Sequence, residues 1–140
     1  TKFGIVFNLD DSTQGGSHWV AGYYDVKKGH IYYFDSYGIR PEERVQKLMR
    51  RVANFCIEEM GIPKNKLVTS FNKTRHQYGN SECGMYSIYF ILNMLEGKDF
   101  EKFNKNKIQD MVVNKFRDTV FHNTNIREKY EKNLTKNKNK

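Results

Sequence analysis

The 140-residue chain contains few cysteines, prolines or tryptophans: two, two and one. Two cysteines are too few for a disulfide framework, and Cys56 and Cys83 lack the spacing of metal ligands. The composition therefore predicts no structural zinc, and we expect no cofactor. It also favours a reducing intracellular compartment, the cytoplasm or the nucleus.

Long apolar runs are also missing. No stretch approaches the roughly 20 apolar residues that a transmembrane helix requires, so we expect no membrane partner. No signal peptide is visible, because Thr1 leads almost at once into a strand-like segment, and this abrupt start predicts a fragment of a longer chain. The length fits one domain, which we predict over residues 1–125.

Acidic residues are outnumbered, with 16 Asp and Glu against 24 Lys and Arg and a formal net charge of +8. This excess suggests acidic partners or nucleic acid. However, residues 127–140 hold six Lys or Arg against two Glu in a Lys- and Asn-rich stretch that has little to bury. We therefore predict that residues 126–140 form a basic, disordered tail rather than a binding site.

The rest of the chain predicts three strands, then a helix, a fourth strand and two helices. Segments rich in β-branched and aromatic residues predict strands at residues 3–9, 18–26, 30–36 and 67–71. Apolar residues at helical spacing predict helices at residues 41–60, 83–96 and 107–121. This order predicts an α+β fold, in which helices pack against a mainly antiparallel sheet.

Two apolar stripes complete the predicted core. Cys56 lies on the stripe of the first predicted helix, so we interpret it as a core residue. The last predicted helix has a stripe that should be its buried face, made of Ile108, Met111, Val112, Phe116 and Val120.

Cys83 is the residue of most chemical interest. It ends a polar, glycine-containing loop and opens the second predicted helix, where the positive end of the backbone dipole lowers the pKa of a thiol. Gly84 beside it leaves room for another chain to approach. Cys83 is therefore a candidate nucleophile, although a lone cysteine is more often a small buried hydrophobe.

Cysteine catalysis needs a base, a group that orients the base, and donors for an oxyanion. His18 is the preferred candidate base, because it follows a Gly-Gly-Ser loop at the start of a strand. His76, in the loop before the cysteine, is the alternative. We predict that His30, near the hairpin turn, and His122, past the last helix, lie at the surface.

Asp35 ends the partner strand of the predicted hairpin and either caps a turn or accepts an imidazole N–H. If Val26 pairs with Ile31, Asp35 lies opposite Gly22 and on the same face as His18. Four residues of strand then separate the two side chains, at about 3.3 Å each, so a hydrogen bond requires a bulge or a strong twist.

Gln77 lies six positions before Cys83. Its side-chain amide and the backbone N–H of Cys83 would make the two-donor pocket that a tetrahedral oxyanion needs. The alternative is that Gln77 is a solvated loop residue.

Four motifs now stand in order along the chain: His18-Trp19, Asp35, Gln77 and Cys83-Gly84. Over about residues 4–121 they resemble the SUMO-protease and adenain-like cysteine proteases. The resemblance implies an adenain-like protease core. It also implies the roles of nucleophile for Cys83, general base and then acid for His18, orienter for Asp35 and oxyanion donor for Gln77.

The resemblance further implies cleavage after Gly-Gly in a ubiquitin-like protein or a viral polyprotein. Trp19 matches an aromatic residue that helps to form a narrow tunnel around Gly-Gly, with Gly84 beside it; core packing is its alternative role. Related SUMO proteases have a second tunnel tryptophan upstream. Its absence here is compatible with a reduced form closer to viral maturation proteases, which would act in the virion.

Two other functions remain open. Effector acyltransferases share this fold and its His, acid and Cys set, but they usually have Glu at the position of Asp35. A basic nucleic-acid-binding domain would instead use Lys and Arg against phosphates. DNA binding is also compatible with proteolysis, since adenain-type enzymes use DNA as a cofactor.

Overall fold

The computed structural model describes residues 1–11 and 16–121. The predicted tail at 126–140, the end of the predicted domain at 125 and His122 lie outside the described residues. The strands are β1 (Lys2–Asp11), β2 (Gly16–Asp25), β3 (His30–Phe34) and β4 (Val68–Phe71). The helices are α1 (Glu43–Glu58), the short 3-10 turn η1 (Lys64–Lys66), α2 (Cys83–Leu95), α3 (Phe100–Lys105) and α4 (Asp110–Phe121).

The four strands form one sheet in the order β1-β2-β3-β4. The β1–β2 and β2–β3 pairs are antiparallel and the β3–β4 pair is parallel. The predicted α+β fold with a mainly antiparallel sheet is therefore confirmed. The parallel pair was not predicted. It arises because α1 forms the crossover that a parallel connection needs.

The hairpin register differs from the predicted one by two residues. Tyr24 pairs with Ile31, and Asp25 with His30, so Val26 belongs to the turn. The turn is closed by a hydrogen bond of 2.8 Å from the Gly29 N–H to the Asp25 carbonyl. Continued past its last pair, this register places Asp35 opposite residue 20 instead of Gly22, and this brings it two residues closer to His18.

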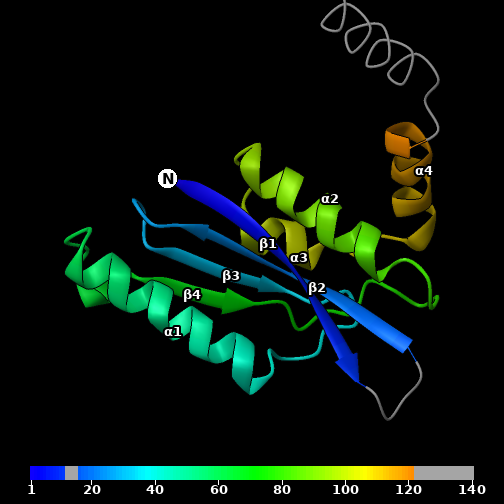
Figure 1. The fold of residues 1–140 in the computed structure, drawn as a ribbon. Coiled ribbons are helices and arrows are strands. Elements are labelled where there is room, and N and C mark those ends of the chain that lie inside the picture. The colour runs from blue at the N-terminus through cyan, green and yellow to red at the C-terminus, as the bar shows by residue number, and fades with distance from the viewer. Residues whose placement is uncertain (12–15, 122–140) are drawn as a thin grey trace, which may run out of the picture.

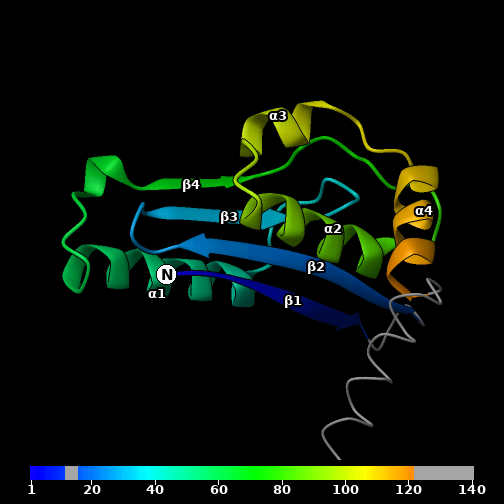
Figure 2. The same cartoon turned by 90° about the horizontal axis from the view of Figure 1, so that it is seen from above.

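Alternation along β2 and β3 divides the core into two clusters, one on each face of the sheet. Figures 1 and 2 show α1 on one face of the sheet and α2 and α3 on the other. The cluster under α1 includes Val20, Tyr24, Ile31 and Tyr33, together with Val45, Met49, Val52 and Cys56 from the helix. The cluster under α2 includes Ala21, Tyr23 and Phe34, together with Met85, Tyr86 and Phe90.

Two helix predictions need comment. Cys56 is fully buried, as predicted for a core residue. The predicted buried stripe of the last helix is largely wrong, because Met111, Val112 and Val120 are exposed and Val113 is the buried residue of α4. Within the described ranges, none of the helices has the length and apolar character to cross a membrane.

Candidate active site

Cys83 is the first residue of α2, as the sequence predicts. Figures 1 and 2 show this end of α2 beside α4, at the edge of the molecule where β2 begins and β3 ends. The backbone N–H of Trp19, on β2, points at the Cys83 sulfur with an N···Sγ distance of 3.5 Å. The thiol therefore lies between the first turn of a helix and a neighbouring strand, and both present N–H groups to it.

His18 and Asp35 are in direct contact. His18 Nε2 lies 2.9 Å from Asp35 Oδ1, and the carboxylate is almost completely buried. Since Nε2 faces the carboxylate, Nδ1 is the ring nitrogen left for the hydrogen bond between His18 and the Cys83 side chain. The three side chains therefore stand in series: carboxylate, imidazole and thiol.

The series shifts both titrating partners toward an ion pair. Burial by itself lowers the pKa of His18, but hydrogen bonds to Asp35 and Cys83 and the charges of both groups raise it to about 9. Burial also raises the pKa of Cys83, yet hydrogen bonds from His18 and from the N–H groups of Trp19 and Gly84 leave it below its ordinary value. Both shifts favour the pair of a thiolate and an imidazolium over the neutral pair.

Asp35 is held in place by its neighbours. The Tyr37 N–H donates to Asp35 Oδ1 at 2.8 Å. The buried amide of Asn72 accepts from the Asp35 N–H at 2.9 Å and donates to the Asp35 carbonyl at 2.6 Å. The Tyr37 ring also lies against His18, with ring centroids 4.8 Å apart. Contacts to the backbone and the carboxylate of Asp35, together with the ring of Tyr37 against His18, thus hold the carboxylate and the imidazole in place.

Gln77 is fully buried, so the alternative of a solvated loop residue is wrong. Its Oε1 accepts from the Ser36 hydroxyl at 2.6 Å, and its Nε2 donates to the Gly79 carbonyl at 3.0 Å. Longer contacts of 3.4 and 3.5 Å join Nε2 to the Tyr37 hydroxyl and to Glu82 Oε2. The amide is therefore firmly oriented within the loop before Cys83.

Trp19 and Gly84 lie side by side next to the thiol. They line a cavity of about 570 Å³ that also includes Cys83, Val6, Met85, Ile88 and Arg117. A Cβ at position 84 would stand 3.8 Å from Trp19 Cδ1, and the tryptophan is 38% exposed. Trp19 is therefore a wall of this cavity instead of a residue enclosed in the core.

His76, the alternative base, is fully buried and is not part of the cysteine, histidine and carboxylate series. Its Nδ1 accepts from the Ile108 N–H at 3.0 Å, and its ring packs near Phe34 and Phe103. Burial, with a smaller effect from Lys107, lowers the pKa of His76 to about 4. His30 is partly buried and packs on Tyr32, with ring centroids 5.3 Å apart.

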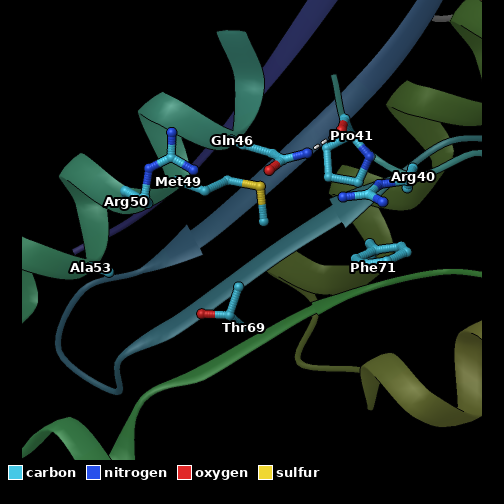
Figure 3. A pocket seen from close by; sticks show the side chains of 8 residues that line it. All are labelled: Arg40, Pro41, Gln46, Met49, Arg50, Ala53, Thr69 and Phe71. Atoms are coloured by element: carbon cyan, nitrogen blue, oxygen red, sulfur yellow. Dashed lines mark hydrogen bonds between the residues drawn. The ribbon is translucent and has the colours of Figure 1, made fainter. Parts of the chain in front are cut away.

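A second cavity, of about 240 Å³, lies between α1 and β4 and is shown in Figure 3. Met49 and Phe71 contribute apolar surface, Arg40 and Arg50 contribute charge, and Gln46 donates to the Pro41 carbonyl at 2.7 Å. It contains none of the predicted site residues, so we place the chemistry at Cys83. Among the described residues, no three His, Cys, Asp or Glu side chains gather in a way that could hold a metal ion.

Four supporting residues were missed by the sequence analysis: Ser36, Tyr37, Asn72 and Asp110. The Ser36 carbonyl accepts from the backbone N–H groups of His76 and Gln77, at 2.8 and 2.9 Å. Asn72 and Asp110 act on segments far from them in sequence, through contacts to residues 35 and 78–79. The distance of such residues from Cys83 along the sequence does not mark them, because only the fold brings them close to the site.

Comparison with known proteins supports the family that the sequence motifs predict. Residues 5–131 match the family model described as the Ulp1 protease family, C-terminal catalytic domain. A protein of Acanthamoeba polyphaga mimivirus, whose name describes a thiol protease, is 36% identical over 118 residues, which cover 84% of this chain and 38% of that protein.

Similar matches come from African swine fever virus. A protein named as a SUMO-1 cysteine protease is 36% identical over 121 residues, which cover 85% of this chain and 43% of that protein. The crystal structure of the protease from this virus aligns with a TM-score of 0.72 and 33% identity, over 83% of this chain and 42% of that chain. The chain thus spans about two fifths of the length of these relatives.

Proposed function

Because the chain belongs to the Ulp1 protease family, we propose that it is the catalytic part of a cysteine protease that cleaves after Gly-Gly. The observation that carries this proposal is the series Asp35–His18–Cys83 at the start of α2. A buried carboxylate, an imidazole and a thiol in this order are what thiol-based acyl transfer needs. The substrate that we propose is a ubiquitin-like protein or a viral polyprotein.

In the first half of the reaction, the Cys83 thiolate attacks the carbonyl carbon of the scissile bond. A C–S bond forms, and the carbonyl electron pair moves onto oxygen. The His18 imidazolium then gives its proton to the leaving nitrogen, the C–N bond breaks, and a thioester remains on Cys83. Asp35 keeps the ring oriented while its charge changes.

In the second half, water attacks the thioester carbonyl and His18 accepts a proton from that water. The C–S bond breaks, the acid product leaves, and Cys83 returns as a thiolate beside an imidazolium. Both halves pass through an oxyanion, for which we assign the Cys83 N–H and the Gln77 amide as donors. Of the two N–H bonds of that amide, the one not directed at Gly79 is held only by the longer contacts and is the better candidate.

The cavity beside Cys83 supports the choice of glycine. Trp19 and Gly84 lie against each other at one side of this cavity. The substrate backbone that we propose would pass along this side, where a site too narrow for a Cβ would select glycine. The name of the swine fever virus relative connects that protein with SUMO-1, which favours a ubiquitin-like protein as the substrate of this chain.

Hydrolysis assays with two substrates test this function. One is a SUMO-type precursor with a C-terminal extension, and the other is a fluorogenic peptide with Gly-Gly before the scissile bond. We expect cleavage after Gly-Gly, a strong loss when the second glycine becomes alanine, and no activity in Cys83→Ala. Cys56→Ala, which removes the other thiol, is the matched control and should retain activity.

Full activity in Cys83→Ala would exclude Cys83 as the nucleophile. If the wild-type protein cleaves neither substrate but gains an acetyl group on Cys83 from acetyl-CoA, the acyltransferase hypothesis replaces proteolysis.

A further inference from the structure

Asp110 is the first residue of α4, and its carboxylate contacts the loop that precedes the nucleophile. Asp110 Oδ2 accepts from the Gly79 N–H at 2.8 Å and from the Tyr78 N–H at 3.2 Å. Asp110 Oδ1 accepts from the Tyr86 hydroxyl at 2.8 Å. One side chain therefore joins three segments that are distant in sequence: the loop, α2 and α4.

The contact to the loop leads directly to Gln77. The N–H of Gly79 is held by Asp110, while its carbonyl accepts from Gln77 Nε2 at 3.0 Å and from the Tyr37 hydroxyl at 3.1 Å. The backbone of Gly79 is thus fixed on both sides. Because Gln77 Nε2 takes its direction from the Gly79 carbonyl, a shift of this backbone would turn the amide.

The contact to α2 leads to Cys83. Tyr86 is three residues after the cysteine, in the first turn of the same helix, and it is fully buried. Its hydroxyl has a single proton to donate and lies near two acceptors, Asp110 Oδ1 and the Ile108 carbonyl at 2.9 Å, so the start of α2 is tied to residues 108–110 through this one side chain. Asp110 therefore holds both the loop with Gln77 and the helix turn with the Cys83 N–H.

The carboxylate of Asp110 is an anchor for a loop that lies at the surface, since Tyr78 and Asn80 on either side of Gly79 are exposed. Burial raises the pKa of Asp110, but hydrogen bonds from Tyr86 and from the N–H groups of Gly79 and Tyr78 lower it below its ordinary value. The group is a carboxylate at neutral pH, and N–H···O bonds to a charged acceptor are the stronger kind.

We propose that Asp110 is a positioning residue that fixes the distance between the two oxyanion donors, the Gln77 amide and the Cys83 N–H. This inference rests on the proposed function, because it assigns Asp110 to the acyl-transfer chemistry of that site. Misplacement of a catalytic group by about 1 Å can cost about 100-fold in rate, so even a small movement is measurable.

Two reactions of the same thiol separate positioning from a general structural role. Alkylation by iodoacetamide forms a C–S bond as iodide leaves, and no oxyanion arises. Acylation by p-nitrophenyl acetate passes through a tetrahedral oxyanion before p-nitrophenolate leaves. The alkylation rate depends on the thiolate alone. The acylation rate depends on the thiolate and also on the oxyanion donors. Neither reagent contains Gly-Gly, so a failure of the proposed substrate class would not affect this comparison.

We expect Asp110→Asn to slow the acylation of Cys83 by about tenfold or more, because Asn keeps one acceptor oxygen and loses the other. The alkylation rate and its pH profile should stay within about twofold of the wild-type values. Asp118→Asn, an exposed change on the same helix, is the matched control and should alter neither rate. Tyr86→Phe removes only the hydroxyl that ties α2 to Asp110 and should give the same pattern with a smaller loss.

An unchanged acylation rate in Asp110→Asn would overturn the proposal, as would equal losses in acylation and alkylation. If circular dichroism shows that Asp110→Asn does not fold, Tyr86→Phe decides: a selective loss of acylation supports the proposal, and its absence overturns it.

Discussion

Asp35 is only 2% exposed, and burying a polar group at such a depth is costly unless its hydrogen bonds are satisfied. His18 Nε2 and the Tyr37 N–H both donate to its Oδ1, while Asn72 fixes its backbone on both sides. Because the carboxylate cannot turn away, the imidazole is held in one orientation. At the scale of residues, the order of the thiol, imidazole and carboxylate depends on this rigidity.

The pKa shifts of His18 and Cys83 predict how the two activities of the thiol depend on pH. The pKa of Cys83 lies below its ordinary value, so alkylation by iodoacetamide should rise with pH and level off before an ordinary thiol would. The pKa of His18 is about 9, so the imidazolium that we propose as the acid for the leaving nitrogen is lost as the pH rises through about 9. Hydrolysis should therefore follow a bell-shaped profile that reports the pair.

The matched measurement is the alkylation profile of His18→Ala. Without the imidazolium, the rise in the alkylation rate should move to higher pH. The variant lacks the hydrogen bond from His18, which lowers the pKa of Cys83 more than the bonds from the Trp19 and Gly84 N–H groups do. An alkylation profile that does not move in His18→Ala would contradict the proposed ion pair.

The sequence pattern predicted which residues form this site, but it did not predict correctly how far apart they lie. The alternation of strand side chains correctly placed His18 and Asp35 on one face. The register was wrong by two residues, because Val26 looks like a strand residue but lies in the turn closed by Asp25 and Gly29. Residue types set the face of a strand, whereas the geometry of the turn sets the register. The supporting contacts of Asn72 and Asp110 depend on that tertiary arrangement and left no local signal.

At the scale of elements, α2 has to place Cys83 at the edge of the sheet while its other turns fill the core. Phe90 is fully buried in the middle of α2 and stacks on Phe34 of β3, with centroids 4.9 Å apart and planes 11° apart. It also packs against Phe103 of α3, with centroids 5.6 Å apart. The position of Cys83 is thus set by aromatic packing two turns farther along the helix.

We predict that Phe90→Ala lowers the free energy of unfolding by about 3–5 kcal/mol, because it leaves a cavity against the rings of Phe34 and Phe103. Leu92→Ala is the matched control, since Leu92 is on the same helix but 41% exposed. Its cost should be less than about 1 kcal/mol. Urea denaturation followed by circular dichroism measures both values, and equal losses would show that the packing of α2 is described incorrectly.

The sequence predicted most elements because their periodicity is long enough to read. Three features were missed or wrong. The helix α3 has only six residues, too few to show a helical period, and the parallel pairing of β4 follows from the crossover rather than from its own residues. In α4, the apolar residues Met111 and Val120 are exposed, so an apolar stripe did not indicate the buried face.

At the scale of the whole molecule, two layers of helices enclose a four-stranded sheet, and the proposed site lies where β2, β3, α2 and α4 come together (Figure 2). Four short motifs in one order were enough to predict the family that the comparison with known proteins shows. The net charge of +8 carries no such information. The binding of DNA therefore stays a prediction, which a salt series would test.

The central claim is that Cys83, activated by His18, reacts with substrates that end in Gly-Gly. The most direct measurement is labelling by a peptide with a Gly-Gly electrophile, followed by intact mass and peptide mapping. We predict one adduct per chain, on Cys83, that forms slowly in His18→Ala and not at all in Cys83→Ala. An adduct on Cys56, or labelling that His18→Ala leaves unchanged, would contradict the account.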